Sequence, residues 1–256
     1  MRSRALLLCG VLGAASLGGV LPGRAAPSSV SGAPLGIPFA FERNDGQTDA
    51  RVAYLARSDD ATLFLTRRAA VFSLTRGGEA AAIRMEFQGS SRDGRIVGEE
   101  RLPGIVNYFV GQDPGAWRTG IPTYSRVRYE NLWEGVDLVF YGNGGRLEYD
   151  LVLAPGADPA AISFTLEGAR GVAIDDAGRL AIRTPVGRMV HEAPRSFQRM
   201  GIGERAVASG YTVSGDRVGF ALGAYDASAP LVIDPLVALS YSTFLGGSLS
   251  DQGNGV

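Results

Sequence analysis

Apolar and polar residues alternate over short stretches along most of this chain. The clearest stretch spans residues 136–153, where two alternating runs flank a break at residues 142–145. Asn and Gly tolerate the positive φ of a tight turn, so this pattern predicts a β-hairpin that ends at Pro155-Gly156. The apolar positions of the two runs are Val136, Leu138, Phe140, Leu147, Tyr149, Leu151 and Leu153.

Similar short runs, separated by turn signals such as Arg92-Asp93-Gly94 and Asp176-Ala177-Gly178, continue from Phe39 to Ile233. Many short strands without a convincing amphipathic helix predict an all-β, antiparallel β-sandwich. Two packed sandwich subdomains are the alternative, with a division near 111–120. The run Glu79–Ala82 supports one helical turn at most.

The N-terminus has the pattern of a secretory signal peptide. Two arginines precede an apolar run from Ala5 to Leu21, and small residues lead to a cleavage point after Ala25. A transmembrane anchor is the alternative, but glycines break the run and it is barely long enough to span a bilayer. We therefore expect a signal peptide over 1–25 and a secreted, cell-surface or periplasmic protein. Residues 26–38 are rich in Pro, Gly and Ser and are expected to be a linker.

Charge and cysteine content exclude several classes of function. Removal of residues 1–25 leaves 22 arginines against 26 acidic residues, a net charge of −4. Such a balance gives no footprint for nucleic acid. The absence of lysine is typical of GC-rich bacterial genomes. Cys9 is the only cysteine and lies within the signal peptide, so the mature chain would have no disulfide, thiolate metal site or cysteine nucleophile.

The best catalytic candidates are carboxylates around the central hairpin. Glu148 and Asp150 are two residues apart and project from one face of their strand, so they suggest the acid and nucleophile of a glycoside hydrolase. The interpretation that we favour is a solvated strand face with arginines 126, 128 and 146 as cross-strand partners. The full set of candidates is Glu130, Glu134, Asp137, Glu148 and Asp150.

Other candidate sites are weaker. His191 is the only histidine, so a triad or a histidine-rich metal site is hard to build, and we expect a surface or edge-strand position. The acidic loops 45–49 and 175–178 suit calcium by type but lack the spacing of a recognised calcium loop. Trp117 and Trp133 could stack on a sugar ring, although core packing is favoured. We assign no catalytic, cofactor-binding or metal-binding residue, and no cofactor beyond a calcium ion without motif support.

The last residues resemble the opening of the repeats in bacterial secreted SBBP-type proteins, whose repeats form seven-bladed β-propellers. The matching residues are Tyr241-Ser242-Thr243, Leu245-Gly246-Gly247, Asp251 and Gly253. Residues 39–236 resemble the uncharacterised all-β domain that precedes such repeats. The marks of this second resemblance are Asn44-Asp45-Gly46-Gln47, Asn107-Tyr108-Phe109, Gly111, Trp117, Gly135–Leu138, Leu147–Asp150, Pro155–Pro159, Pro194, Gln198 and Leu231–Pro235.

The resemblance implies an all-β module over 39–236 and a partial first repeat over 237–256. One partial repeat cannot close a propeller, because each blade needs neighbours to bury its faces. We therefore expect a non-catalytic exported module with a structural or surface-interaction role. The alternative is a carbohydrate-binding module or a glycoside hydrolase. The expected partner is a protein or a glycan at the cell surface, without nucleic acid and without a membrane span after signal cleavage.

Overall fold

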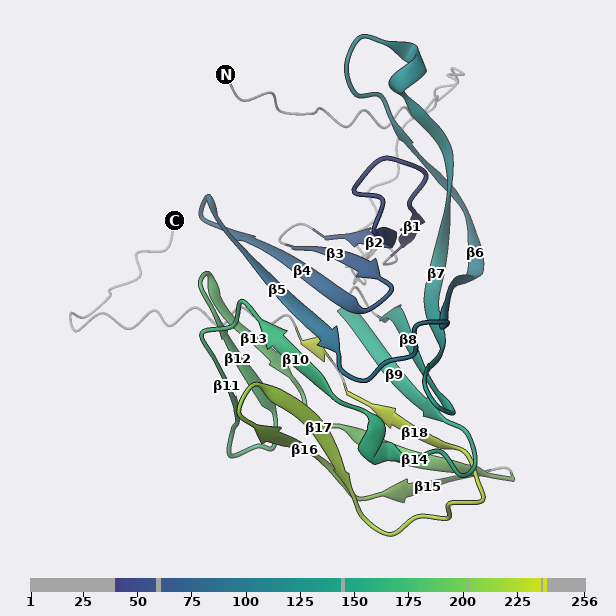
Figure 1. The fold of residues 1–256 in the computed structure, drawn as a ribbon, viewed down its shortest axis with the longest axis vertical. Helices are drawn as coiled ribbons and strands as arrows, with labels where there is room; N and C mark the ends of the chain where they lie inside the picture. Colours follow the sequence, from purple (N-terminus) through teal and green to yellow (C-terminus); the bar gives the residue numbers. More distant parts are fainter. Residues whose placement is uncertain (1–39, 59–60, 144–145, 202, 236, 239–256) are drawn as a thin grey trace, which may run out of the picture.

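The computed structural model describes residues 40–238 apart from 59–60, 144–145, 202 and 236. This part of the chain is built of antiparallel strands and two short 3₁₀ helices (Figure 1). The expected all-β, antiparallel fold is thus confirmed. The predicted signal peptide, the linker and nearly all of the predicted repeat segment lie outside the described residues.

The elements follow one another in this order. They are β1 (Phe41–Arg43), β2 (Val52–Arg57), β3 (Ala61–Thr66), β4 (Ala69–Arg76), β5 (Glu79–Phe87), β6 (Arg95–Tyr108), η1 (Pro114–Ala116), β7 (Arg118–Trp133), β8 (Val136–Asn143), β9 (Arg146–Leu153), η2 (Pro159–Ala161), β10 (Phe164–Glu167), β11 (Gly171–Ile174), β12 (Leu180–Thr184), β13 (Gly187–His191), β14 (Arg195–Met200), β15 (Gly203–Val207), β16 (Ser209–Ser214), β17 (Arg217–Leu222), β18 (Leu231–Asp234) and β19 (Val237–Ala238).

Two sheets contain these strands. The large sheet has the order β15-β14-β18-β9-β8-β7-β1-β2-β3-β4-β5-β10-β17-β16, and the small sheet has the order β11-β12-β13-β19. Strand β7 is a branch point, because β6 pairs with it in addition to β1 and β8. The strands β6 and β7 extend together as a long ribbon beyond the other strands (Figure 1).

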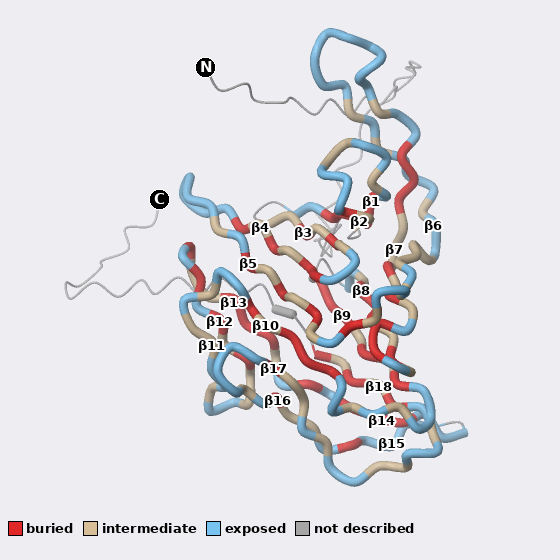
Figure 2. Tube along the Cα trace, in the orientation of Figure 1, coloured by how far each residue is buried: buried red, intermediate tan, exposed pale blue. Residues whose placement is uncertain are grey.

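The large sheet folds over on itself around an aromatic core. The ring of Phe87 on β5 lies 5.4 Å from Tyr129 and 6.0 Å from Trp133, both on β7, although four strands separate β5 from β7 in the sheet order. Such contacts are possible only if the inner faces of the two regions meet. Figure 2 shows the buried residues gathered along the inner strands, whereas the ribbon end and the turns are exposed.

The predicted central hairpin is confirmed as the pair β8 and β9. Phe140 lies opposite Tyr149 and Leu138 opposite Leu151, and all seven predicted apolar positions of the hairpin are buried. Glu79–Ala82, where the sequence allowed one helical turn at most, begins β5 and pairs with β4. Cross-strand pairing here outweighs the helix propensity of three alanines.

Residues 111–120, where the sequence allows a division into two subdomains, form the far end of the ribbon and the start of β7. Asp113 caps the short helix η1 by accepting a hydrogen bond from the Gly115 amide. From Arg118 onward the same strand runs into the large sheet, where it contributes Tyr129 and Trp133 to the core. The ribbon is therefore continuous with the sheet through β7.

Candidate anion-binding cleft

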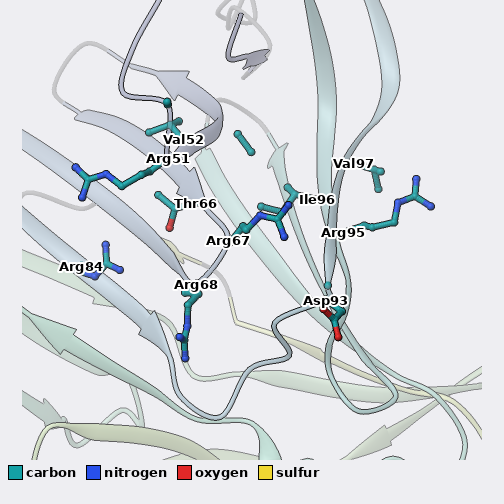
Figure 3. A pocket seen from close by; sticks show the side chains of 13 residues that line it. Arg51, Val52, Thr66, Arg67, Arg68, Arg84, Asp93, Arg95, Ile96 and Val97 are labelled. Carbon is teal, nitrogen blue, oxygen red and sulfur yellow. The ribbon is translucent and has the colours of Figure 1, made fainter. Parts of the chain in front are cut away.

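A cleft of about 610 Å³ opens between the start of β6, the start of β2 and the turn from β3 to β4 (Figure 3). One wall is the segment 93–97, which leads into β6. The opposite wall is made of residues 50–53 at the start of β2 and of the turn between β3 and β4. Arg84 on β5 completes the lining. Four segments of the chain therefore meet at this opening.

The lining of the cleft is strongly basic, with five arginines against the single carboxylate of Asp93. Three of the arginines have carboxylate partners, at nitrogen-to-oxygen distances of 2.7, 3.9 and 3.6 Å. These pairs are Arg51–Asp49, Arg84–Glu167 and Arg95–Glu130. Arg67 and Arg68 are exposed and form no ion pair with any residue that the structure describes. Two guanidinium groups are therefore available for an anion from solution.

Arg67 and Arg68 are held in place by their backbone. They form the two-residue turn between β3 and β4, in which the Ala69 amide donates to Thr66 Oγ1 over 3.1 Å. The buried Tyr129 hydroxyl donates to the Thr66 carbonyl over 2.9 Å, and the Phe87 amide donates to the Arg68 carbonyl over 2.8 Å. The turn is thus anchored to β7 and β5, so the two side chains extend from a rigid base.

The turn itself gives no reason for two arginines. Compact two-residue hairpin turns favour Asn or Gly at positive φ, whereas neither arginine has a positive φ. Figure 3 shows the Arg67 and Arg68 side chains extending in different directions from the turn. Figure 3 shows Arg67 extending toward β6, while Arg95 points away from the other arginines.

The β6 wall is fixed by Gly98, which packs against two tyrosines. The Gly98 amide donates to the Tyr54 hydroxyl over 2.8 Å, and the rings of Tyr54 and Tyr124 meet edge to face at 5.8 Å. A Cβ atom at Gly98 would lie 2.6 Å from the Tyr124 ring. Only glycine permits this approach of β6 to β2, and the width of the cleft depends on it.

A second hollow of about 380 Å³ adjoins the cleft and shares Arg51, Val52, Thr66 and Arg84 with it. Its floor contains Phe64 on β3, which pairs directly with Val71 on β4. Val71 in turn pairs with Arg84 on β5. The two hollows together form one groove with a basic part and an apolar part.

The structure brings two of the predicted carboxylates, Glu148 and Asp150, together on β9. The expectation of a solvated strand face is wrong for Glu148, which is 6% exposed. Its carboxylate accepts a hydrogen bond from Asn143 Nδ2 over 3.2 Å, and Tyr141 donates to Asp150 over 3.0 Å. Burial raises the pKa of Asp150. Neighbouring side chains on β8 thus cover and bind these carboxylates.

A third carboxylate, that of Asp234, stands beside this pair. Ile233 on β18 pairs with Leu151 on β9, which places the following residue opposite Asp150. Asp234 Oδ1 is buried and has no hydrogen-bond partner among the described residues. Burial, followed by the charges of Asp150 and Glu148, raises the pKa of Asp234 to about 6. The sequence pattern of the hairpin alone could not reveal this contact between strands 84 residues apart.

The other predicted carboxylates are dispersed. Arg128 donates to Asp137 over 3.0 Å and to Glu99 over 2.6 Å. Arg128 is thus confirmed as a cross-strand partner of carboxylates, but these are Asp137 and Glu99 instead of Glu148. Glu130 pairs with Arg95 at the cleft rim, and Glu134 lies in the exposed turn before β8. These groups do not converge with Glu148 on one site.

His191 is fully buried, so the expectation of a surface or edge-strand position is wrong. Its strand β13 lies between β12 and β19 in the small sheet. Its Nδ1 lies 3.3 Å from the Tyr149 hydroxyl, and Nε2 has no described partner. Burial lowers the pKa of His191 to about 4. The small sheet covers this part of the large sheet, a tertiary contact that local sequence could not show.

The two acidic loops use their carboxylates within the protein. Asp175 accepts from Arg179 and from Arg188 over 3.0 Å, whereas Asp45 and Asp49 bind Arg43 and Arg51, respectively. Among the residues described by the structure, no group of three or more His, Cys, Asp or Glu side chains is placed to hold a metal ion.

The two tryptophans lie in different surroundings. Trp133 is buried, and its Nε1 donates to the Gln88 carbonyl over 2.8 Å. Trp117 is 36% exposed at the ribbon end and meets the Phe109 ring edge to face at 5.1 Å. They form no common sugar platform.

Sequence reasoning also missed Arg67 and Arg68, although two adjacent arginines between alternating runs, where turn residues are usual, were a usable signal.

The comparisons with known proteins identify a family. Residues 41–236 match the model of a family described as a domain of unknown function (DUF7948), and the chain belongs to this family. The matched range begins with β1 and ends after β18, so it contains the whole large sheet. No curated protein and no solved structure matches the chain. Among the described residues, no helix has the length and apolar character needed to cross a membrane.

Proposed function

We propose that this domain is a non-catalytic interaction module that binds an anionic ligand in the arginine-lined cleft. The observation that carries the proposal is the pair Arg67 and Arg68, which has no carboxylate partner in the described chain and projects from an anchored turn into a basic cleft. Guanidinium groups bind carboxylate, sulfate and phosphate through paired N–H donors, and such charge-assisted bonds are stronger than neutral ones.

The charge distribution supports this proposal. The mature chain is acidic overall, with 22 arginines against 26 acidic residues, whereas the cleft lining has five arginines and one aspartate. A local positive potential on a negatively charged protein directs an anion to one place on its surface. The signal-peptide pattern and the resemblance to domains that precede propeller repeats support a location outside the cytoplasm, where the domain would present this cleft to surface ligands.

The carboxylates of the central hairpin do not favour hydrolysis. Glu148 is 6% exposed and is hydrogen-bonded to Asn143, while Asp150 is bonded to Tyr141. A glycoside hydrolase needs two carboxyl groups that face the scissile bond from a groove. Because these two groups are engaged by neighbours on β8, we do not propose a catalytic role for them.

The proposal is tested by binding to two polymers that differ only in charge. We expect fragment 26–238 to bind dextran sulfate and to ignore neutral dextran of the same length, with an affinity that falls as salt rises because exposed charges are screened. The double variant Arg67→Ser/Arg68→Ser should lose at least tenfold in affinity, since each charged hydrogen bond contributes about 1.5–3 kcal/mol. Calorimetry measures both effects.

A matched control separates the cleft from net charge. Arg217→Ser removes an exposed arginine at the start of β17, outside the cleft, and should leave the affinity unchanged. Equal losses of affinity in Arg217→Ser and in the single variant Arg67→Ser would show a diffuse charge effect and contradict the proposal. Absence of binding to dextran sulfate, by a fragment with intact β-sheet circular dichroism, would also contradict it.

A further inference from the structure

We infer that the ligand of the cleft is an acidic polysaccharide that runs across both hollows, with its charged groups on the arginines and one sugar ring on Phe64. This inference rests on the proposed function and adds the chemical class of the ligand. Its basis is the combination of two hollows, of about 610 and 380 Å³, that share four lining residues but differ in chemistry.

The second hollow supplies an apolar surface of suitable form. Phe64 and Val71 are cross-strand partners on β3 and β4, and both are partly exposed within a sheet whose opposite face is core. The neighbouring residues Leu63, Leu65 and Phe72 point into that core and are buried. An aromatic ring beside an aliphatic side chain fits the apolar C–H face of a pyranose. A bare phosphate or sulfate ion would leave this surface unused.

Two apolar side chains and then a charged one follow each other along the groove at the spacing of adjacent strands. Phe64, Val71 and Arg84 are successive partners across β3, β4 and β5. Neighbouring strands lie about 4.8 Å apart, so Arg84 lies about 10 Å from Phe64 along this row. A chain of sugars repeats at a comparable scale, so a ring over Phe64 and a carboxylate or sulfate at the arginines can belong to one ligand.

Shape also distinguishes this groove from a site for a compact anion. A small anion needs several donors that converge on one point, whereas the cleft arginines come from the turn before β2, from the β3–β4 turn, from β5 and from β6. Figure 3 shows these side chains spread around the opening instead of directed at one centre. Dispersed single charges match a polymer with one charge per residue.

The experiment compares two polyanions of equal charge number, an oligogalacturonate and a linear polyphosphate, on the wild-type fragment and on Phe64→Leu. Leucine keeps an apolar side chain at this partly exposed position and removes the flat aromatic face. We expect tighter binding of the oligogalacturonate, and a loss of about tenfold in that affinity in Phe64→Leu with polyphosphate binding unchanged. Val213→Leu on β16, outside the groove, is the matched hydrophobic control.

Each outcome has a separate meaning. Equal affinity for both polyanions, or equal losses of affinity for both in Phe64→Leu, would overturn the polysaccharide assignment. If binding still depends on Arg67 and Arg68, the proposed function stays intact. Preference for polyphosphate would point to a phosphate-bearing polymer and also overturn the assignment. Binding of neither polyanion overturns both proposals. If Phe64→Leu lowers the thermal midpoint, Phe64→Tyr, which keeps the ring, must retain oligogalacturonate binding for the inference to stand.

Discussion

The arginine cleft and the buried interior differ in how their polar side chains are placed. At the cleft, Arg67 and Arg68 extend into solvent from an anchored turn. In the interior, His191 on β13 of the small sheet and Gln198 on β14 of the large sheet are 0% exposed, and Gln198 satisfies its amide with the backbone of a neighbouring loop. Enclosed polar groups determine stability because burial makes their hydrogen bonds and charges costly to lose. Exposed charges contribute little to stability and are free to bind a ligand.

The largest effect is expected at Gln198. Its Nε2 donates to the Asp226 carbonyl over 2.7 Å, and its Oε1 accepts from the Asp226 amide over 2.8 Å. Gln198→Leu leaves both backbone groups unpaired inside the protein and should lower the free energy of unfolding by about 4 kcal/mol. Urea denaturation measures this value. Gln112→Leu, on the exposed ribbon end, should change it by less than about 0.5 kcal/mol, and similar losses in both variants would refute the contrast.

The next largest effect is the loss of folding stability at low pH that the buried His191 causes. The pKa of His191 is about 4 in the folded protein and 6.5 for the free side chain. Between these values the unfolded chain binds more protons, so stability falls as the pH falls from 6.5 to 4, by about 3 kcal/mol in total. Urea midpoints across this range measure the slope. In His191→Phe the slope should become shallower, and a variant that keeps the wild-type slope would show that other groups cause the acid sensitivity.

A smaller effect of opposite sign is expected at Asp234. Its pKa rises from 3.8 to about 6 on folding, so between these values the folded chain binds more protons. Asp234 therefore favours folding as the pH falls through 6 and disfavours it at neutral pH. Asp234→Asn should raise the thermal midpoint at pH 7 and steepen the loss of stability toward pH 4. Asp216→Asn, in an exposed turn, should do neither; a midpoint lowered at pH 7 by Asp234→Asn would contradict the sign.

The smallest effect on stability is expected at the cleft itself. Arg67→Ser/Arg68→Ser removes two exposed side chains without ion-pair partners among the described residues. The free energy of unfolding should change by less than about 0.5 kcal/mol. A loss above about 2 kcal/mol in urea denaturation would show that the arginines support the fold, and the loss of ligand binding could then not be assigned to the cleft.

Much of the fold follows from the local pattern of residues. Alternation identified the hairpin β8–β9, because one face of each strand is buried against the core and register then fixes every position. The pattern at Glu79–Ala82 is ambiguous because alanine fits either a helix or a strand. Pairing with β4 selects the strand. The folding of the large sheet over itself, shown by Phe87 against Tyr129, depends on long-range contacts that no short window contains.

The site was less predictable than the fold for the same reason. The cleft brings together residues near 51, 67, 84 and 95, which belong to four separate strand regions. Each arginine alone looks like an ordinary surface residue. The burial of His191 and Glu148 likewise depends on what packs over them, as the small sheet does over Tyr149 and His191. Only the adjacent pair Arg67-Arg68, in place of turn residues, carried a local signal.

The end of the described chain fastens the two layers together. Strand β18 lies between β9 and β14 in the large sheet, and a few residues later β19 pairs with β13 in the small sheet. A pulling force applied at Ala238 would first separate β19 from β13 and then act on an interior strand bonded on both sides. We expect two steps in a single-molecule unfolding trace, a weak one and a strong one. This arrangement would let β19 detach from the small sheet under tension while the cleft stays intact.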